Sequence, residues 1–97
     1  MDNFKNKVLK AIDLCNAELV DRKSGIEGES TIEQLEKVII PELEQILDMI
    51  DKQQLPPKEK RYLNGFANAF KVWGWNMQNP TEIFVLITEL NDMYKDI

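Results

Sequence analysis

Apolar residues recur at steps of three and four positions in four stretches of the chain, a spacing typical of amphipathic helices. The first stretch, at about 3–20, places its apolar residues on one helical face: Phe4, Val8, Ala11, Ile12, Cys15 and Leu19. The following segment, 21–30, has two glycines and few apolar residues. It is predicted to be an exposed loop.

The second stretch is predicted to begin at Ser30, because Ser30 and Glu33 have the spacing of a capping box. Its apolar positions keep one phase over the whole stretch: Ile32, Leu35, Ile39, Leu43, Ile46 and Ile50. Pro41 lies in the middle and removes one backbone hydrogen bond. Since the phase continues past the proline, we expect one helix with a kink at Pro41; a break into two helices is the alternative.

Two further helices are predicted after the prolines of the Leu55-Pro56-Pro57 segment, which end the second. The third begins at Pro57 and carries an aromatic stripe that is expected to form the centre of the core: Tyr62, Phe66, Phe70 and Trp73. Asn79 and Pro80 are start signals for the fourth helix. The apolar face of that helix comprises Ile83, Leu86, Ile87, Leu90, Tyr94 and Ile97.

Four amphipathic helices with short connections predict an all-α fold, an antiparallel four-helix up-down bundle with a Pro41-kinked second helix. No stretch alternates with a period of two, so no strand is predicted. The 97 residues are expected to form one helical-bundle domain, 1–97, with a single core.

The net charge of −5 and the isoelectric point near 4.7 disfavour nucleic acids and anionic membranes as partners. Cys15 is the sole cysteine, as expected in a reducing compartment, and the first residues do not resemble a signal peptide. We therefore expect a cytoplasmic protein. The apolar surroundings of Cys15 favour a buried, inert thiol.

The negative charge is concentrated between Glu27 and Asp51, where eight acidic residues accompany one basic residue. This segment has a net charge of −7, whereas the rest of the chain has +2. At about 100° per residue, four of these carboxylates fall within about 60° of one another, and two more flank them. The first four are Glu33, Glu44, Asp48 and Asp51, and the flanking pair is Glu29 and Glu36. This predicts an acidic, partner-binding helical face; the alternative is an ordinary solvated face.

Trp75 lies about 170° from the aromatic stripe if the third helix continues that far. An exposed tryptophan there would be a candidate anchor for a partner. Alternatively, Gly74 ends the helix and Trp75 folds back onto a neighbouring helix, which is the more common environment for a large aromatic side chain.

Enzymatic chemistry has few candidate residues in this chain, which has no histidine. A Ser-His-Asp triad and a di-iron Glu-x-x-His site are therefore excluded, and one cysteine cannot form a zinc site. The acidic pairs Glu33/Glu36 and Glu89/Asp92 could hold Mg²⁺ if their helices adjoin, as in an all-α nucleotide hydrolase. No catalytic residue, metal or cofactor is otherwise predicted.

The sequence therefore predicts a small acidic binding protein that is not an enzyme and that neutralises a basic protein partner. Its best concrete form is an immunity protein, an inhibitor of a cognate toxin nuclease, since cationic nuclease clefts attract carboxylates. A carboxylate–Mg²⁺ nucleotide hydrolase and a helical scaffold or adaptor are the alternatives. A monomer or a weak dimer is expected.

Overall fold

A computed structural model describes residues 2–97, and the fold is all-helical, without strands in that range. The first helix is α1 (Asp2–Lys23). A second helical stretch comprises α2 (Ile32–Gln34), the π-helical segment η1 (Leu35–Ile39) and α3 (Ile40–Asp51). A 3₁₀ turn, η2 (Lys58–Lys60), precedes α4 (Asn64–Lys71) and α5 (Glu82–Asp96). None of the helices within residues 2–97 combines the length and hydropathy needed to cross a membrane.

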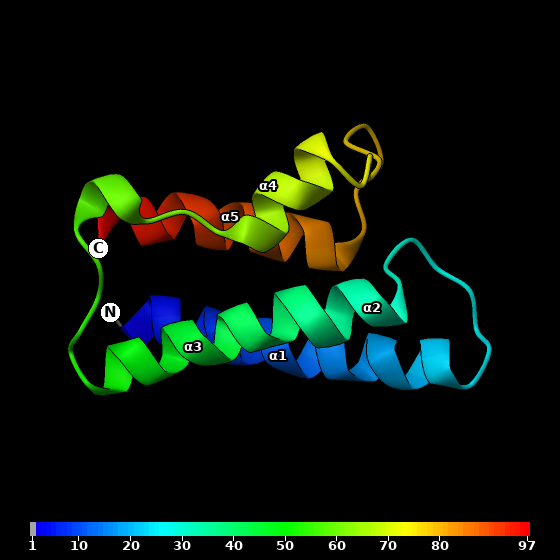
Figure 1. Cartoon of the computed structure of the whole chain (residues 1–97), viewed down its shortest axis with the longest axis horizontal. Helices are drawn as coiled ribbons and strands as arrows, with labels where there is room; N and C mark the ends of the chain where they lie inside the picture. The colour runs from blue at the N-terminus through cyan, green and yellow to red at the C-terminus, as the bar shows by residue number, and fades with distance from the viewer. Residues whose placement is uncertain (1) are drawn as a thin grey trace.

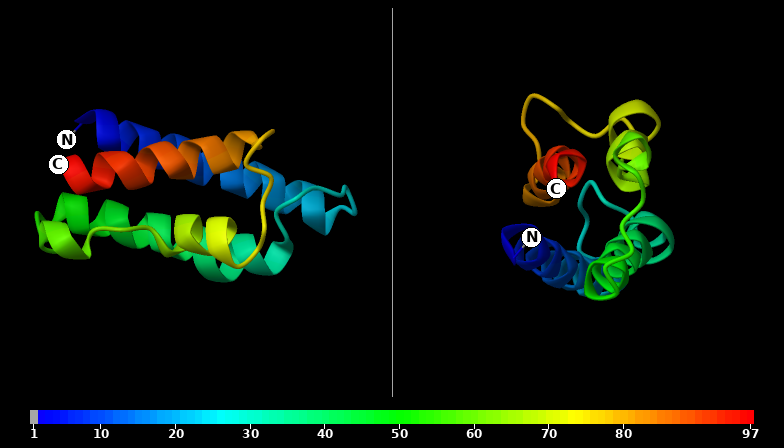
Figure 2. Two further views of the ribbon diagram at one scale, coloured as in Figure 1. Left: turned by 90° about the horizontal axis from the view of Figure 1, so that it is seen from above. Right: turned by 90° about the vertical axis from the view of Figure 1, so that its left-hand side faces the viewer.

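The helices form two layers, with α1 beside the α2–α3 stretch and α4 beside α5 (Figures 1 and 2). The layers meet through contacts of α1 with α5 and of η1 with α4. The molecule measures 39 × 24 × 20 Å. The beginning of α1 and the end of α5 lie at the same end of the molecule, where the rings of Phe4 and Tyr94 stack with centroids 5.7 Å apart.

The predicted apolar faces of the first and fourth helices are confirmed at most positions; Ile12, Leu19 and Ile97 are only partly buried. In α1 the buried side chains are Phe4, Val8, Ala11 and Cys15, and in α5 they include Ile83, Leu86, Ile87, Leu90 and Tyr94. The predicted start of the fourth helix is wrong by two residues. Thr81, not Asn79, is the N-cap, because its hydroxyl accepts a hydrogen bond from the Phe84 amide at 3.3 Å.

The capping box of the second helix is shifted by one residue from its prediction. The Thr31 hydroxyl accepts from the Gln34 amide, and the Gln34 side chain accepts from the Thr31 amide, both at 3.1 Å. Ser30 belongs to the preceding loop instead, where it is buried and its carbonyl accepts a hydrogen bond from Arg22 Nε at 2.6 Å. Arg22 also donates to the Ser30 hydroxyl at 3.3 Å, so this hydroxyl is engaged in the loop while that of Thr31 caps the helix.

The helical conformation continues without a gap from Ile32 to Asp51, past Pro41. The turn before the proline is π-helical, with the Ile40 amide bonded to the Leu35 carbonyl. Pro41 has no amide hydrogen, and in a regular α-helix its ring would clash with the carbonyl four residues earlier. A wider turn relieves that clash, so the proline is accommodated within a continuous helical stretch.

The predicted start of the third helix at Pro57 is wrong, because α4 begins at Asn64 and has eight residues. A 3₁₀ turn and an extended segment occupy the intervening positions. The start of α4 is set by two residues distant in sequence. The Glu42 carboxylate accepts hydrogen bonds from the amides of Asn64 at 2.7 Å and Gly65 at 2.9 Å, and Asn91 Oδ1 accepts from the Leu63 amide at 2.9 Å.

The predicted aromatic centre of the core is also wrong. Tyr62 and Phe70 are 55% and 44% exposed. Phe66 and Trp73 are only partly buried. The fully buried aromatic side chains are Phe4, Trp75, Phe84 and Tyr94, from α1, α5 and the segment after α4. Because α4 spans only Asn64–Lys71, Tyr62 and Trp73 lie outside the helix, and the stripe packs at the edge of the core instead of at its centre.

Cys15 lies in the core with no exposed surface, as its position in the apolar face predicts. Burial, aided by the nearby Glu18 charge, raises the pKa of its thiol to about 12. Unfolding would return the pKa to its ordinary value, so the thiol stabilises the fold below about pH 9 and this contribution declines as the pH rises toward 12.

We expect unfolding free energies measured in urea at pH 8, 9.5 and 10.5 to fall more steeply for the native chain than for a Cys15→Ala variant. The variant corrects for other groups that titrate in this range, including Tyr94, whose pKa burial also raises. Parallel pH profiles for the two proteins would contradict the assignment.

Candidate functional site

Three carboxylates lie on one exposed side of α3, opposite its buried residues Leu43, Ile46 and Ile50. They belong to Glu44, Asp48 and Asp51, which we call the α3 acidic surface. At about 100° per residue they fall within about 60° of one another, as predicted, since no irregularity separates them. All three side chains are exposed to solvent.

Glu33 does not share this alignment. The π-helical segment lies between it and α3, and a π turn contains about one residue more than an α turn. Positions before the segment are therefore rotated by about 100° relative to their predicted phase. Ile32, which was expected in the buried stripe, is 38% exposed, whereas Leu35 at the start of the π-helical segment is buried as expected.

Lysines pair with three of the predicted partner-binding carboxylates. Asp48 binds Lys52 at 3.1 Å, Asp51 binds Lys5 at 2.8 Å and Glu36 binds Lys23 at 2.9 Å. The hydrogen bond from Lys23, with the charge of that lysine, lowers the pKa of the Glu36 carboxyl. Because the paired side chains are about 40–60% exposed, solvent screens each ion pair, and the carboxylates remain accessible to a competing cation.

Two other acids of the 27–51 segment point toward the protein. Glu42 caps α4, and Glu29 Oε2 accepts a hydrogen bond from the Asn76 amide at 2.9 Å. The second oxygen of Glu29 is buried and has no hydrogen-bond partner among the described residues. Glu29 therefore connects the loop after α1 to the segment after α4, and we do not include it in the exposed acidic surface.

Trp75 is buried, with 4% of its surface exposed, and is not available as a surface anchor in this structure. The helix ends before it, and Gly74 takes a left-handed conformation with φ of 67°. The Trp75 amide donates a hydrogen bond back to the Ala69 carbonyl at 3.0 Å. The indole packs edge-on against Phe84 of α5, with the ring centroids 5.6 Å apart. This is the alternative in which the tryptophan folds back, and Gly74 supplies the necessary turn.

The acidic pairs considered for Mg²⁺ are not brought together. Within residues 2–97, no group of three or more Asp, Glu, Cys or His side chains is close enough to hold a metal ion. Glu36 pairs with Lys23 and Glu89 pairs with Lys7, so a lysine already occupies one carboxylate of each pair.

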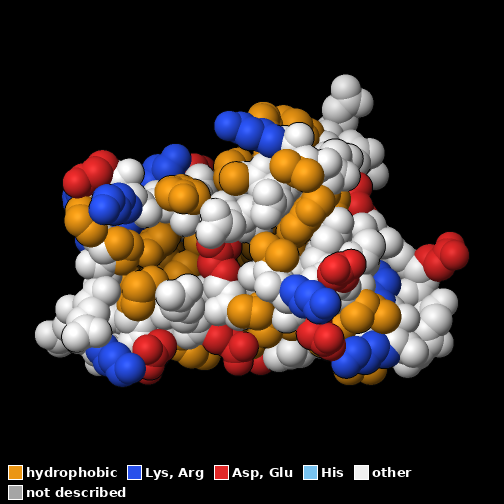
Figure 3. Space-filling model, in the orientation of Figure 1, with side chains coloured by type: hydrophobic (Ala, Val, Ile, Leu, Met, Phe, Trp, Pro, Cys, Tyr) orange, Lys and Arg blue, Asp and Glu red, His pale blue; other side chains and the backbone are white. Residues whose placement is uncertain are grey.

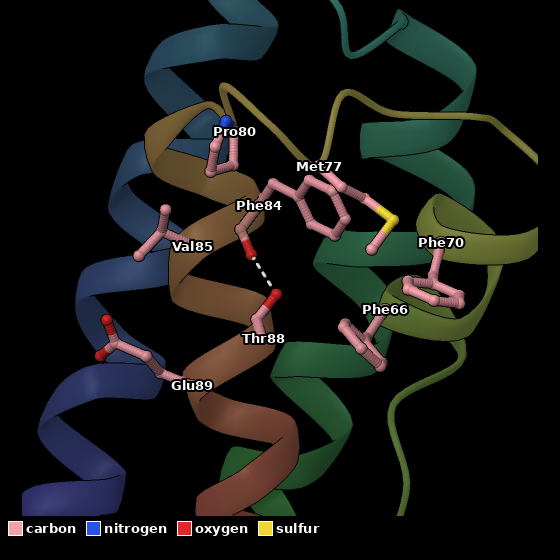
Figure 4. Close-up of a pocket in the computed structure, with 8 residues that line it drawn as sticks. All are labelled: Phe66, Phe70, Met77, Pro80, Phe84, Val85, Thr88 and Glu89. Atoms are coloured by element: carbon pink, nitrogen blue, oxygen red, sulfur yellow. Dashed lines mark hydrogen bonds between the residues drawn. The ribbon is translucent and has the colours of Figure 1, made fainter.

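The sequence did not predict an apolar groove of about 300 Å³ that lies between α4 and α5 (Figure 4). Its floor and walls are formed by Phe66, Phe70, Met77, Pro80, Phe84, Val85, Thr88 and Glu89; we call this the α4–α5 groove. In the view of Figure 3, apolar side chains gather at the surface of α4, whereas acidic and basic side chains intermingle along α2 and α3. A signal in the sequence was Gly74, which lies just after α4 and takes a φ of 67° where the chain turns back.

The structure thus contains an exposed acidic surface on α3 and an apolar groove between α4 and α5. Comparison with known proteins assigns neither of them: no model of a protein family matches the chain, and no curated protein or solved structure is significantly similar to it.

Proposed function

We propose that this chain is a small cytoplasmic binding protein, not an enzyme, that neutralises a basic protein partner. In its most specific form, the proposal is an immunity protein that inhibits a toxin nuclease. The observation that carries it is the α3 acidic surface, where Glu44, Asp48 and Asp51 project from one side of a regular helix. A nuclease needs a cationic cleft to bind phosphates, and a row of carboxylates can occupy that cleft in place of the substrate.

The lysines that pair with Asp48 and Asp51 are compatible with this role. Both ion pairs are largely solvated, so breaking them costs little. Arginines of a partner would form stronger bidentate contacts with the same carboxylates in a desolvated interface. Electrostatic attraction would also accelerate the encounter of the two proteins.

The scaffold that we propose for this surface is an antiparallel up-down bundle in which Pro41 kinks the second helix. The π-helical segment next to Pro41 supports the kink, because prolines and π turns are the usual causes of helix bending. The carboxylates all follow the proline, on a helix that packs against α1. Such support would keep their spacing fixed and lower the entropy lost on binding.

Neutralising this surface should slow the capture of the partner. The immobilised chain is used to isolate a basic nuclease, whose association rate is then measured with the purified proteins at 50 mM NaCl. For the triple variant Glu44→Gln/Asp48→Asn/Asp51→Asn, we expect the association rate to fall roughly tenfold and inhibition of cleavage to weaken, because long-range attraction is lost.

The control is the triple variant Asp2→Asn/Asp13→Asn/Glu59→Gln, which removes the same number of exposed charges elsewhere. We expect its association rate to remain within about twofold of the native value. Equal slowing by the two triple variants would show that only net charge matters. Binding of a nuclease without inhibition would contradict the immunity role.

A further inference from the structure

The α4–α5 groove offers a partner apolar contacts and almost no hydrogen bonds. Phe70, Met77 and Val85 are 44%, 58% and 40% exposed along it, and the Phe84 ring lies at its floor (Figure 4). The Thr88 hydroxyl donates to the Phe84 carbonyl at 2.7 Å, so its single proton is already used. An occupant must therefore gain its affinity from burying bulky apolar side chains.

One rim of this groove is acidic. On α5, exposed residues recur at steps of three and four: Glu82, Val85, Glu89, Asp92 and Asp96. At about 100° per residue they fall within about 80° of one another. Val85 and Glu89 also line the groove, and the other three carboxylates continue the same side of α5 beyond it; we call the four the α5 acidic stripe (Glu82, Glu89, Asp92 and Asp96). Lys7 pairs with Glu89, and the only cation on α4 is Lys71 at its last position.

An apolar floor beside a line of carboxylates is complementary to a helix that has an apolar face bordered by Lys or Arg. We propose that the α4–α5 groove docks a basic amphipathic helix of a partner protein. Apolar side chains spaced at i, i+3 or i+4 and i+7 enter the groove, and the flanking cations face the α5 acidic stripe. This docking does not depend on the α3 acidic surface, which lies on another helix.

The test uses three synthetic 18-residue peptides and measures dissociation constants by calorimetry at 50 and 300 mM NaCl. The first contains leucine and lysine in an amphipathic order, the second replaces its lysines with glutamates, and the third scrambles the first so that no apolar face forms. We expect micromolar binding of the first peptide and at least tenfold weaker binding of the other two. Failure of the first peptide to bind, or equal binding of the scrambled peptide, overturns the proposal.

Variants of the protein locate the binding. Phe70→Ser and Val85→Ser alter exposed groove residues, and each should weaken binding of the first peptide about tenfold. If the Phe70→Ser variant does not fold, the Val85→Ser variant alone still tests the proposal. The stripe variant Glu82→Gln/Asp92→Asn/Asp96→Asn should weaken binding about tenfold at 50 mM NaCl and less at 300 mM. The α3 variant Glu44→Gln/Asp48→Asn/Asp51→Asn removes the same charge and should change binding less than twofold.

Equal losses in the stripe and α3 variants would indicate attraction to net charge alone and would overturn the docking proposal, without deciding whether the α3 surface binds a nuclease. Sedimentation velocity from 10 to 300 μM identifies the competing occupant. A dimer in the native chain that Val85→Ser dissociates would assign the groove to a second copy of this chain.

Discussion

Replacing Phe84 with alanine is expected to lower the free energy of unfolding by roughly 3–5 kcal/mol. The Phe84 side chain is 4% exposed and packs against two other aromatic rings. The distances between ring centroids are 5.6 Å to Trp75 and 6.4 Å to Phe66. Its removal leaves a cavity between α5 and the segment after α4, which cannot collapse without moving Trp75. A loss of this size is a large share of the stability of a small domain.

Urea denaturation followed by far-UV circular dichroism measures this loss. Phe70→Ala is the matched control, since it removes the same atoms from a ring that is 44% exposed. We expect it to cost less than about 1.5 kcal/mol, because little buried surface is lost. If Phe70→Ala were as costly as Phe84→Ala, the core would be centred on the aromatic stripe after all.

Replacing Glu42 with alanine is expected to cost about 2 kcal/mol, although the residue lies within an acidic segment. Its two carboxylate oxygens accept hydrogen bonds from the first amides of α4, those of Asn64 and Gly65. Helix N-termini favour negative charge, and charged acceptors make stronger hydrogen bonds than neutral ones. The alanine variant leaves both amides without this partner.

Glu42→Gln should cost about half as much, since one acceptor oxygen remains and the charge is lost. Glu44→Ala, two positions away and exposed, is the control and should change stability by less than about 0.5 kcal/mol. Thermal unfolding at neutral pH of the native chain and of the Glu42→Ala, Glu42→Gln and Glu44→Ala variants measures these differences in stability. An equal effect at positions 42 and 44 would mean that the Glu42 carboxylate does not stabilise α4.

The spacing of apolar residues predicted the helices whose packing follows that spacing. The apolar phases of α1 and α5 gave their buried faces correctly, because each helix packs one continuous side on the core. The predictions failed where a distant residue decides. Arg22 holds Ser30 in the loop so that Thr31 caps the helix, and Glu42 determines where α4 begins.

The candidate sites follow the same division. The alignment of Glu44, Asp48 and Asp51 was predictable because they lie within one regular helix. The position of Glu33 was not predictable, since the π-helical segment between it and α3 changes the number of residues per turn. The fold-back of Trp75 was one of the two alternatives that the sequence offered, with Gly74 as its signal. The groove also depends on the late start of α4, where Glu42 and Asn91 from elsewhere in the chain bind the first amides.

The π-helical segment also has an evolutionary consequence. The segment contains one residue more than a regular α turn would need. A related chain that lacks one residue within Leu35–Ile39 could therefore form a regular α turn there and keep α2 and α3 in their present orientation. Such a chain should also lack the proline at the position of Pro41, because a regular turn would bring its ring against a carbonyl. Homologues that gain or lose a single residue here are expected to change the proline at the same time.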